Sequence, residues 1–179
     1  MITKLEALLG YYEELKGKDR QEIDMVKVIG FGLFSTRRLD EITKIKWDQV
    51  DDEEQRVLIK DMKGAGGDVW CQVPDEAWAI MNSIPRIKDE PFPYSTTSIR
   101  ASFNKVCKIL QIKDLSFYDL RDEGVARLFE MGWDAPKAAS VSGHSELGAM
   151  GKYTHLSGAG DKYKSWVWSE KIVASESIL

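Results

Sequence analysis

Three stretches in the C-terminal part of the chain decide its expected fold and function: Tyr118-Asp-Leu-Arg121, Ser142-Gly-His-Ser145 and Lys152-Tyr-Thr-His155. Each is ordinary when taken singly, because an arginine on a helix is usually a solvated charge and a Gly-His-Ser sequence is usually a turn. Together they supply an arginine, a histidine and a tyrosine, residue types that can bind and attack a phosphate. Their order therefore predicts a site for phosphate chemistry.

The sequence around these stretches is mainly helical. Apolar residues recur at helical spacing, so eight or nine helices are expected, at 3–16, 21–34, 37–46, 75–82, 98–110, 117–131, 135–142, 146–153 and 161–174. The most apolar segment, 21–34, should be the buried helix, and Ser35-Thr36 should cap the helix that follows it. Two β-prone runs around a glycine-rich turn between Arg56 and Val73 predict an antiparallel hairpin. The expected fold is therefore mainly α-helical α+β with one small antiparallel sheet, which excludes a doubly wound or barrel fold.

Composition limits the class of protein. With 179 residues, 43% of them hydrophobic, the chain should form a single domain with its own core. Cys71 and Cys107 are far apart and lack a metal-binding spacing, so we expect reduced thiols in a cytoplasmic protein and no metal. The longest apolar run, Val28–Phe34, is too short for a membrane span. The formal net charge of −4 counts against a nucleic-acid partner, unless the basic side chains gather on one face.

The three stretches resemble the second motif box of the tyrosine recombinases, the phage integrase family. In that box a His-x-x-Arg helix precedes a Leu-Gly-His-Ser turn and a nucleophilic tyrosine in a Tyr-x-His context. Upstream, the sequence from Ser35 to Asp51 resembles the first box, where Arg-x-x-Glu leads a helix that ends in Leu-x-Trp-x-Asp. This alignment matches Arg38 and Glu41 and leaves Arg37 one position out.

The resemblance implies the catalytic domain of a site-specific DNA recombinase, or integrase, that cuts and rejoins double-stranded DNA without a metal or other cofactor. Arg38 and Arg121 would neutralise the phosphate oxygens with their planar guanidiniums. His144 would donate a further hydrogen bond to the same phosphate. Lys63, which fits the family's hairpin lysine better than Lys60 does, would protonate the departing 5′ oxygen. Tyr153 would attack the phosphorus and form a 3′-phosphotyrosyl link.

The chain departs from the family pattern at two places. Tyr118 stands where the family usually has histidine, and its hydroxyl can donate a hydrogen bond but carries no charge near neutral pH. The hairpin turn Gly64–Asp68 lacks the basic residues often found there. His155, two residues after the nucleophile, is expected to have a structural or supporting role. Two alternatives stay open: a non-catalytic DNA-binding paralogue, which would explain Tyr118, and a type IB topoisomerase, which shares this chemistry.

The two ends of the chain also carry expectations. Integrases of this family have an N-terminal DNA-binding domain, whereas this chain has only about 20 residues before the helix that leads into the first box. Residues 1–179 would be either an excised catalytic domain, which we favour, or a naturally short relative. The tail, 161–179, corresponds to a segment that often docks on a neighbouring protomer, which implies self-association on DNA. Trp166, Trp168 and Ile172 could anchor that contact or pack on their own domain.

Overall fold

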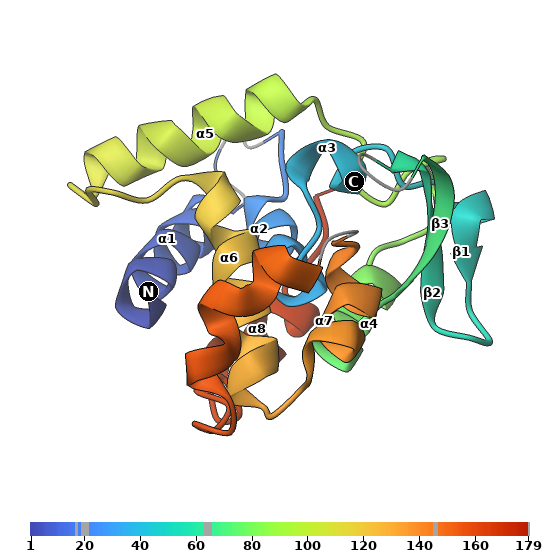
Figure 1. Ribbon diagram of the computed structural model, residues 1–179. Helices are drawn as coiled ribbons and strands as arrows, with labels where there is room; N and C mark the ends of the chain where they lie inside the picture. The colour runs from blue at the N-terminus through green and yellow to red at the C-terminus, as the bar shows by residue number, and fades with distance from the viewer. Residues whose placement is uncertain (17, 19–21, 63–65, 145–146, 179) are drawn as a thin grey trace.

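The computed structural model describes residues 1–16, 18, 22–62, 66–144 and 147–178 (Figure 1). These residues form eight α-helices, two 3₁₀ helices and one three-stranded sheet. The elements are α1 (Ile2–Leu15), α2 (Met25–Ser35), α3 (Leu39–Ile42), η1 (Trp47–Gln49), β1 (Val50–Asp51), β2 (Arg56–Met62), β3 (Gly67–Gln72), α4 (Asp75–Asn82), α5 (Thr96–Ile109), α6 (Phe117–Glu130), α7 (Ala135–Ser142), η2 (Leu147–Leu156) and α8 (Val167–Ala174). The expected mainly helical α+β fold is confirmed.

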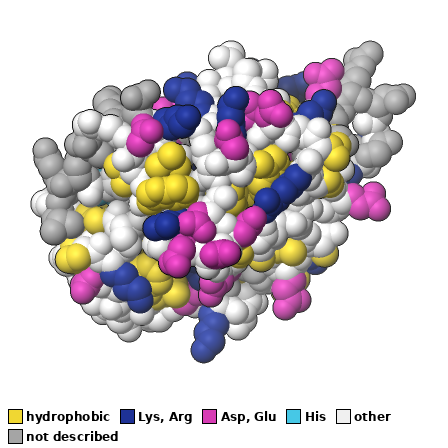
Figure 2. All heavy atoms as spheres, turned by 90° about the vertical axis from the view of Figure 1, so that its right-hand side faces the viewer, with side chains coloured by type: hydrophobic (Ala, Val, Ile, Leu, Met, Phe, Trp, Pro, Cys, Tyr) yellow, Lys and Arg dark blue, Asp and Glu magenta, His cyan; other side chains and the backbone are white. Residues whose placement is uncertain are grey.

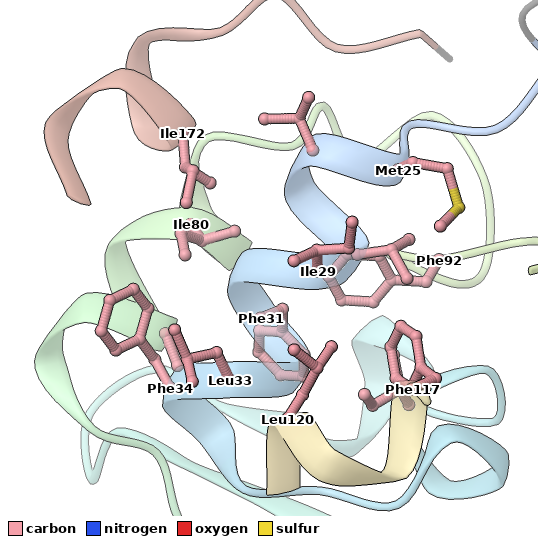
Figure 3. Packing of buried hydrophobic residues seen from close by; sticks show 14 of the residues in the cluster. Met25, Ile29, Phe31, Leu33, Phe34, Ile80, Phe92, Phe117, Leu120 and Ile172 are labelled. Atoms are coloured by element: carbon pink, nitrogen blue, oxygen red, sulfur yellow. The ribbon is translucent and has the colours of Figure 1, made fainter. Parts of the chain in front are cut away.

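Helix α2 is the centre of the fold. All of its residues are buried, as the sequence predicted, and it packs against α1, α4, α6 and α8. The helix begins at Met25 rather than near position 21, because the Asp24 side chain accepts a hydrogen bond from the Lys27 amide and caps the first turn. Figure 3 shows Phe117 and Leu120 of α6 directed onto Phe31 of α2.

The crossing of α2 and α6 depends on Gly124. A Cβ atom there would collide with the Leu33 carbonyl and press on the Thr36 side chain. The absence of a side chain at Gly124 lets α6 lie close against the end of α2. Arg121, one turn earlier on α6, is thereby brought to the segment that follows α2.

The prediction of a helix over 37–46 capped by Ser35-Thr36 is wrong. Thr36 has a left-handed backbone, with φ 56°, and ends α2. The next helix, α3, is only four residues long and is capped at Arg38, whose amide donates to the Glu41 carboxylate at 3.0 Å. The left-handed residue turns the chain, so that Arg37 and Arg38 lie outside the helices and Arg38 is extended.

The expected hairpin is confirmed as β2 and β3, which pair antiparallel with Val57 opposite Cys71. A third strand, β1, pairs antiparallel with β2 and was not predicted. The sheet stands on one side of the helices (Figure 1). Seen from that side, lysines and arginines alternate with acidic and apolar side chains (Figure 2), so the sheet face carries no field of a single sign.

The C-terminal part differs in detail from the prediction. Residues 147–156 form the 3₁₀ helix η2 instead of an α-helix, and the tail helix α8 begins at Val167 instead of Asp161. Trp166 and Ile172 are buried in the chain's own core. Cys71 and Cys107 are buried free thiols. No helix within the described ranges is long and apolar enough to cross a membrane.

Candidate active site

Arg38 and Arg121 line one cavity of about 230 Å³ between α3, α5 and α6. Arg38 extends from the cap of α3 and Arg121 from α6. Arg37, Arg100 and Tyr118 line the same cavity. The gathering of guanidiniums from three separate parts of the chain makes this the strongest anion-binding candidate among the described residues.

Arg121 is buried, with 2% of its surface exposed. Its Nη1 donates to the Thr36 carbonyl oxygen at 2.5 Å, and its Nη2 lies 3.4 Å from His144 Nε2. Burial lowers the pKa of Arg121 to about 10, and the charges of Arg38 and Arg37 act in the same direction. The guanidinium is therefore still charged at neutral pH, and a bound anion would offset the repulsion around it.

His144 follows the end of α7, where Gly143 adopts a left-handed backbone with φ 67°. Its Nδ1 lies 2.7 Å from the Ser142 hydroxyl, which fixes the ring while Nε2 faces Arg121. Burial lowers the pKa of His144 to about 4, and Arg121 and other cations reinforce the shift. The imidazole is therefore neutral at pH 7 in the absence of an anion.

Glu41 and Arg37 organise the positive charges. The Glu41 carboxylate is buried, lies 2.9 Å from Arg38 Nη1 and is 3.7 Å from Arg37 Nη1. Arg37, which the sequence had set aside as one position out, is 2% exposed and donates to the Val141 carbonyl; its Nη1 is 3.1 Å from Cys71 Sγ. Arg37 thus ties β3 to the last turn of α7, just before His144. The sequence signal for this role is the pair of consecutive arginines, Arg37 and Arg38.

Tyr153 is on η2 and is held against α6. Its hydroxyl donates to Asp122 Oδ1 at 2.6 Å, and its ring, 7% exposed, stacks on Phe129 with the centroids 5.8 Å apart. Burial and, next, the Asp122 carboxylate raise the pKa of Tyr153 to about 12. The Nζ atom of Lys152 lies 3.4 Å from the same carboxylate. The phenol therefore keeps its proton in this arrangement.

The structure thus brings Arg38, Arg121 and His144 together. Tyr118 lies at the rim of the cavity with 57% of its surface exposed. His155 is exposed. Lys63 and the start of its turn lie outside the described residues. No group of three or more His, Cys, Asp or Glu within the described ranges could hold a metal ion.

The chain is similar to known proteins in sequence and in fold. A model of the phage integrase family matches residues 4–159. The shufflon-specific DNA recombinase of Escherichia coli is 26% identical over 132 residues, which are 72% of this chain and 34% of that protein. The catalytic domain of bacteriophage HP1 integrase has a similar fold, with a TM-score of 0.61, 16% identity, and coverage of 88% of this chain and 86% of that one. The Tn1549 transposon integrase in complex with transposon right end DNA has a TM-score of 0.62 and 14% identity, with coverage of 83% and 58%.

The fold is that of the catalytic domains of tyrosine recombinases. The chain belongs to the phage integrase family. It spans about a third of the length of the curated recombinase that it matches.

Proposed function

We propose that this chain is the catalytic part of a site-specific DNA recombinase that cuts and rejoins double-stranded DNA through Tyr153. The observation that carries the proposal is that Arg38 and Arg121 line one cavity. His144 lies 3.4 Å from Arg121, and Tyr153 is bonded to Asp122, the next residue of α6. The DNA-binding relatives named above support DNA as the substrate.

The proposed reaction needs charge neutralisation more than a strong acid or base. Arg38 and Arg121 would bind the non-bridging oxygens of one phosphodiester, whose negative charge grows as the phosphorus is attacked. The neutral His144 can donate one more hydrogen bond from Nε2 when Ser142 donates to Nδ1. Glu41 and Arg37 would hold these groups in place without touching the substrate.

In the proposed step the Tyr153 oxygen bonds to phosphorus and the bond from phosphorus to the 5′ oxygen breaks. The phenol proton passes to solvent, and Lys63 protonates the departing 5′ oxygen. The product is a 3′-phosphotyrosyl link and a free 5′ hydroxyl. A 5′ hydroxyl from a partner strand then attacks the link in reverse, which rejoins DNA without a nucleotide cofactor.

We also propose that the protein acts in the cytoplasm and self-associates on DNA. In the structure the tail anchors Trp166 and Ile172 pack on their own chain, so association through the tail would require it to undock. The proposed partners are therefore double-stranded DNA and a second copy of this chain, with residues 1–179 acting as one catalytic domain.

Covalent capture tests the proposed function. The chain is incubated with a library of duplexes that are random in sequence and carry a nick, so that the short cleaved piece diffuses away. We expect an adduct that survives denaturant. After nuclease and trypsin digestion, the modified peptide should be Tyr153–Lys162, which contains a single tyrosine. An adduct on any other peptide would refute the assignment of the nucleophile.

Two outcomes distinguish the alternatives. A non-catalytic paralogue would retain duplexes from the library without any adduct. A topoisomerase would form the adduct and relax supercoils without joining strands from two duplexes. Arg121→Ala should slow capture by about a hundredfold or more, because one missing donor to the developing charge commonly costs about 3 kcal/mol. Arg56→Ala, a change on the sheet, is the matched control and should leave capture unchanged.

A further inference from the structure

Helix α6 carries two consecutive carboxylates, and each accepts a hydrogen bond from a tyrosine of the C-terminal region. Asp122 accepts from the Tyr153 hydroxyl at 2.6 Å, and Glu123 accepts from the Tyr163 hydroxyl at 2.7 Å. The two contacts have the same chemistry, but only Tyr153 is the proposed nucleophile. The contact between Glu123 and Tyr163 therefore serves as a control for the contact between Asp122 and Tyr153.

The position of Asp122 next to Arg121 matters for the reaction. Consecutive residues of an α-helix point about 100° apart, so a phenol bound to Asp122 is directed to a different side of α6 from the Arg121 guanidinium. The Tyr153 hydroxyl is bonded to Asp122 Oδ1, and Lys152 Nζ lies 3.4 Å from the same oxygen. The tyrosine is thus close to the site in the fold but is not engaged with its positive charges.

The hydrogen bond between Tyr153 and Asp122 can also break without leaving an unpaired charge. The Asp122 side chain is 38% exposed, and Lys152 Nζ already lies 3.4 Å from its Oδ1. If Tyr153 leaves, the carboxylate keeps a cationic partner and regains water, so no buried charge is left unpaired.

We propose that Asp122 is a positioning residue that holds Tyr153 in a resting arrangement, and that Tyr153 must leave Asp122 before its oxygen can attack a phosphate bound by Arg38 and Arg121. The inference rests on the proposed function for the identity of the nucleophile. Asp122 touches neither substrate nor the reacting phosphorus. Asp122 lowers the fraction of time in which the Tyr153 phenol is free to attack the phosphate.

The test compares single-turnover capture rates at saturating nicked duplex for Asp122→Ala, Asp122→Asn and Glu123→Gln. Asp122→Ala should raise the saturated rate by about five- to tenfold, the change expected when one hydrogen bond to a partly exposed charged acceptor is removed from the resting state. Asp122→Asn keeps an acceptor without the charge and should give a smaller rise. Glu123→Gln removes the matching charge one residue away and should leave the rate unchanged.

The capture rate at saturating DNA distinguishes a positioning role of Asp122 from an effect on DNA binding and from a role as general base. Loss of a negative charge alone strengthens DNA binding, which lowers the half-saturating DNA concentration and leaves the saturated rate unchanged. An Asp122 that served as the base for Tyr153 would give a lower rate in both Asp122 variants. A lower or unchanged saturated rate would overturn the proposal.

A second measurement needs no activity. Backbone hydrogen exchange of a peptide covering 147–156 should be faster in free Asp122→Ala than in the wild type or in Glu123→Gln, because the contact that holds Tyr153 is gone. If wild type and variants all fail to form an adduct, the proposed function fails, and the exchange result still decides the role of Asp122. Unchanged exchange over 147–156 would overturn that role.

Discussion

Tyr153 and Tyr163 are ten residues apart, and both bond to carboxylates of the same helix, yet they are held very differently. Tyr163 is 2% exposed and packs edge-on against Phe34 and Trp166 in the main core. Tyr153 packs in a smaller second cluster around α6 and α7. Burial and Glu123 raise the pKa of Tyr163 beyond that of Tyr153. One tyrosine is a structural anchor, and the other is held by an exchangeable contact.

The segments on which they lie differ in the same way. The start of the tail is fixed by Arg127, which binds Asp161 through both Nε and Nη2, at 2.9 and 2.8 Å, and also pairs with Glu76. Farther along, the buried Lys27 donates to the last carbonyls of α8. Among the described side chains of η2, those of Tyr153 and Lys152 bond to the rest of the fold, and both contact Asp122. The difference indicates that η2 can move while the tail stays docked.

The largest expected effect separates the two tyrosines by activity. Tyr153→Phe should abolish the covalent adduct and leave DNA binding nearly unchanged, since only the attacking oxygen is lost. Tyr163→Phe should retain the adduct, but it removes one of two partners of Glu123 Oε1, the other being Lys162 at 2.8 Å, and should lower the free energy of unfolding by about 1 kcal/mol. Denaturing gels and urea unfolding measure the two effects. An adduct formed by Tyr153→Phe would break the comparison.

The next effect concerns the stability of the tail. Arg127→Met keeps much of the side-chain volume but leaves Asp161 and Glu76 without their cation, so we expect a loss of about 3 kcal/mol in the free energy of unfolding. Asp122→Ala, on the exposed η2 contact, should cost less than about 1 kcal/mol. Urea midpoints of the two variants give the comparison directly. Equal losses would mean that the two segments are held equally firmly.

Packing gives a smaller effect of the same kind. A Cβ added at Gly30 would lie 2.8 Å from Ile172 Cγ2 and 3.1 Å from Ile80 Cδ1, so Gly30→Ala should push α8 outward and cost about 1–3 kcal/mol. Figure 3 shows Ile172 and Ile80 together beside α2. At Gly148 of η2 a Cβ meets no atom within 4 Å. Gly148→Ala is therefore the matched control and should be neutral in thermal unfolding.

The sequence predicted the parts of the site that depend on local order. Arg121, His144 and Tyr153 belong to short motifs, and Arg38 is fixed by its spacing from Glu41. The helical periods placed α1, α2, α5 and α6 within a few residues of their observed bounds. Short motifs and the helical spacing of apolar residues depend on neighbours along the chain. The helix predictions succeeded because helices depend on the same local order. The catalytic roles themselves stay predictions.

The rest depends on contacts between distant segments. Arg37 acquires its role only because α7 and β3 meet beside it, and Asp122 becomes a partner of Tyr153 only because η2 folds back on α6. The short α3 follows from a left-handed Thr36, a conformation that a threonine rarely adopts and that no period predicts. Strand β1 is two residues long, too short for an alternating pattern.

The effect confined to a single side chain is a proton equilibrium at His144. Its folded pKa of about 4 lies below the ordinary 6.5 because of burial and the neighbouring arginines. The unfolded chain therefore binds a proton at higher pH than the folded one. The resulting contribution to stability is complete above pH 6.5 and is lost as the pH falls from 6.5 toward 4.

An anion in the cavity should reverse this shift. Sulfate bound by Arg38 and Arg121 would offset the charges that disfavour the imidazolium, so the pKa of His144 should rise when sulfate is added. The chain has only two histidines, so His155→Gln leaves a single imidazole signal to follow by NMR. Tyr153 takes no part in this equilibrium, and Asp122→Ala should give a sulfate-induced rise of similar size. The contrary outcome is a His144 pKa that neither sulfate nor Arg38→Ala changes. It would show that the arginines do not form the anion site from which the resting Tyr153 is held apart.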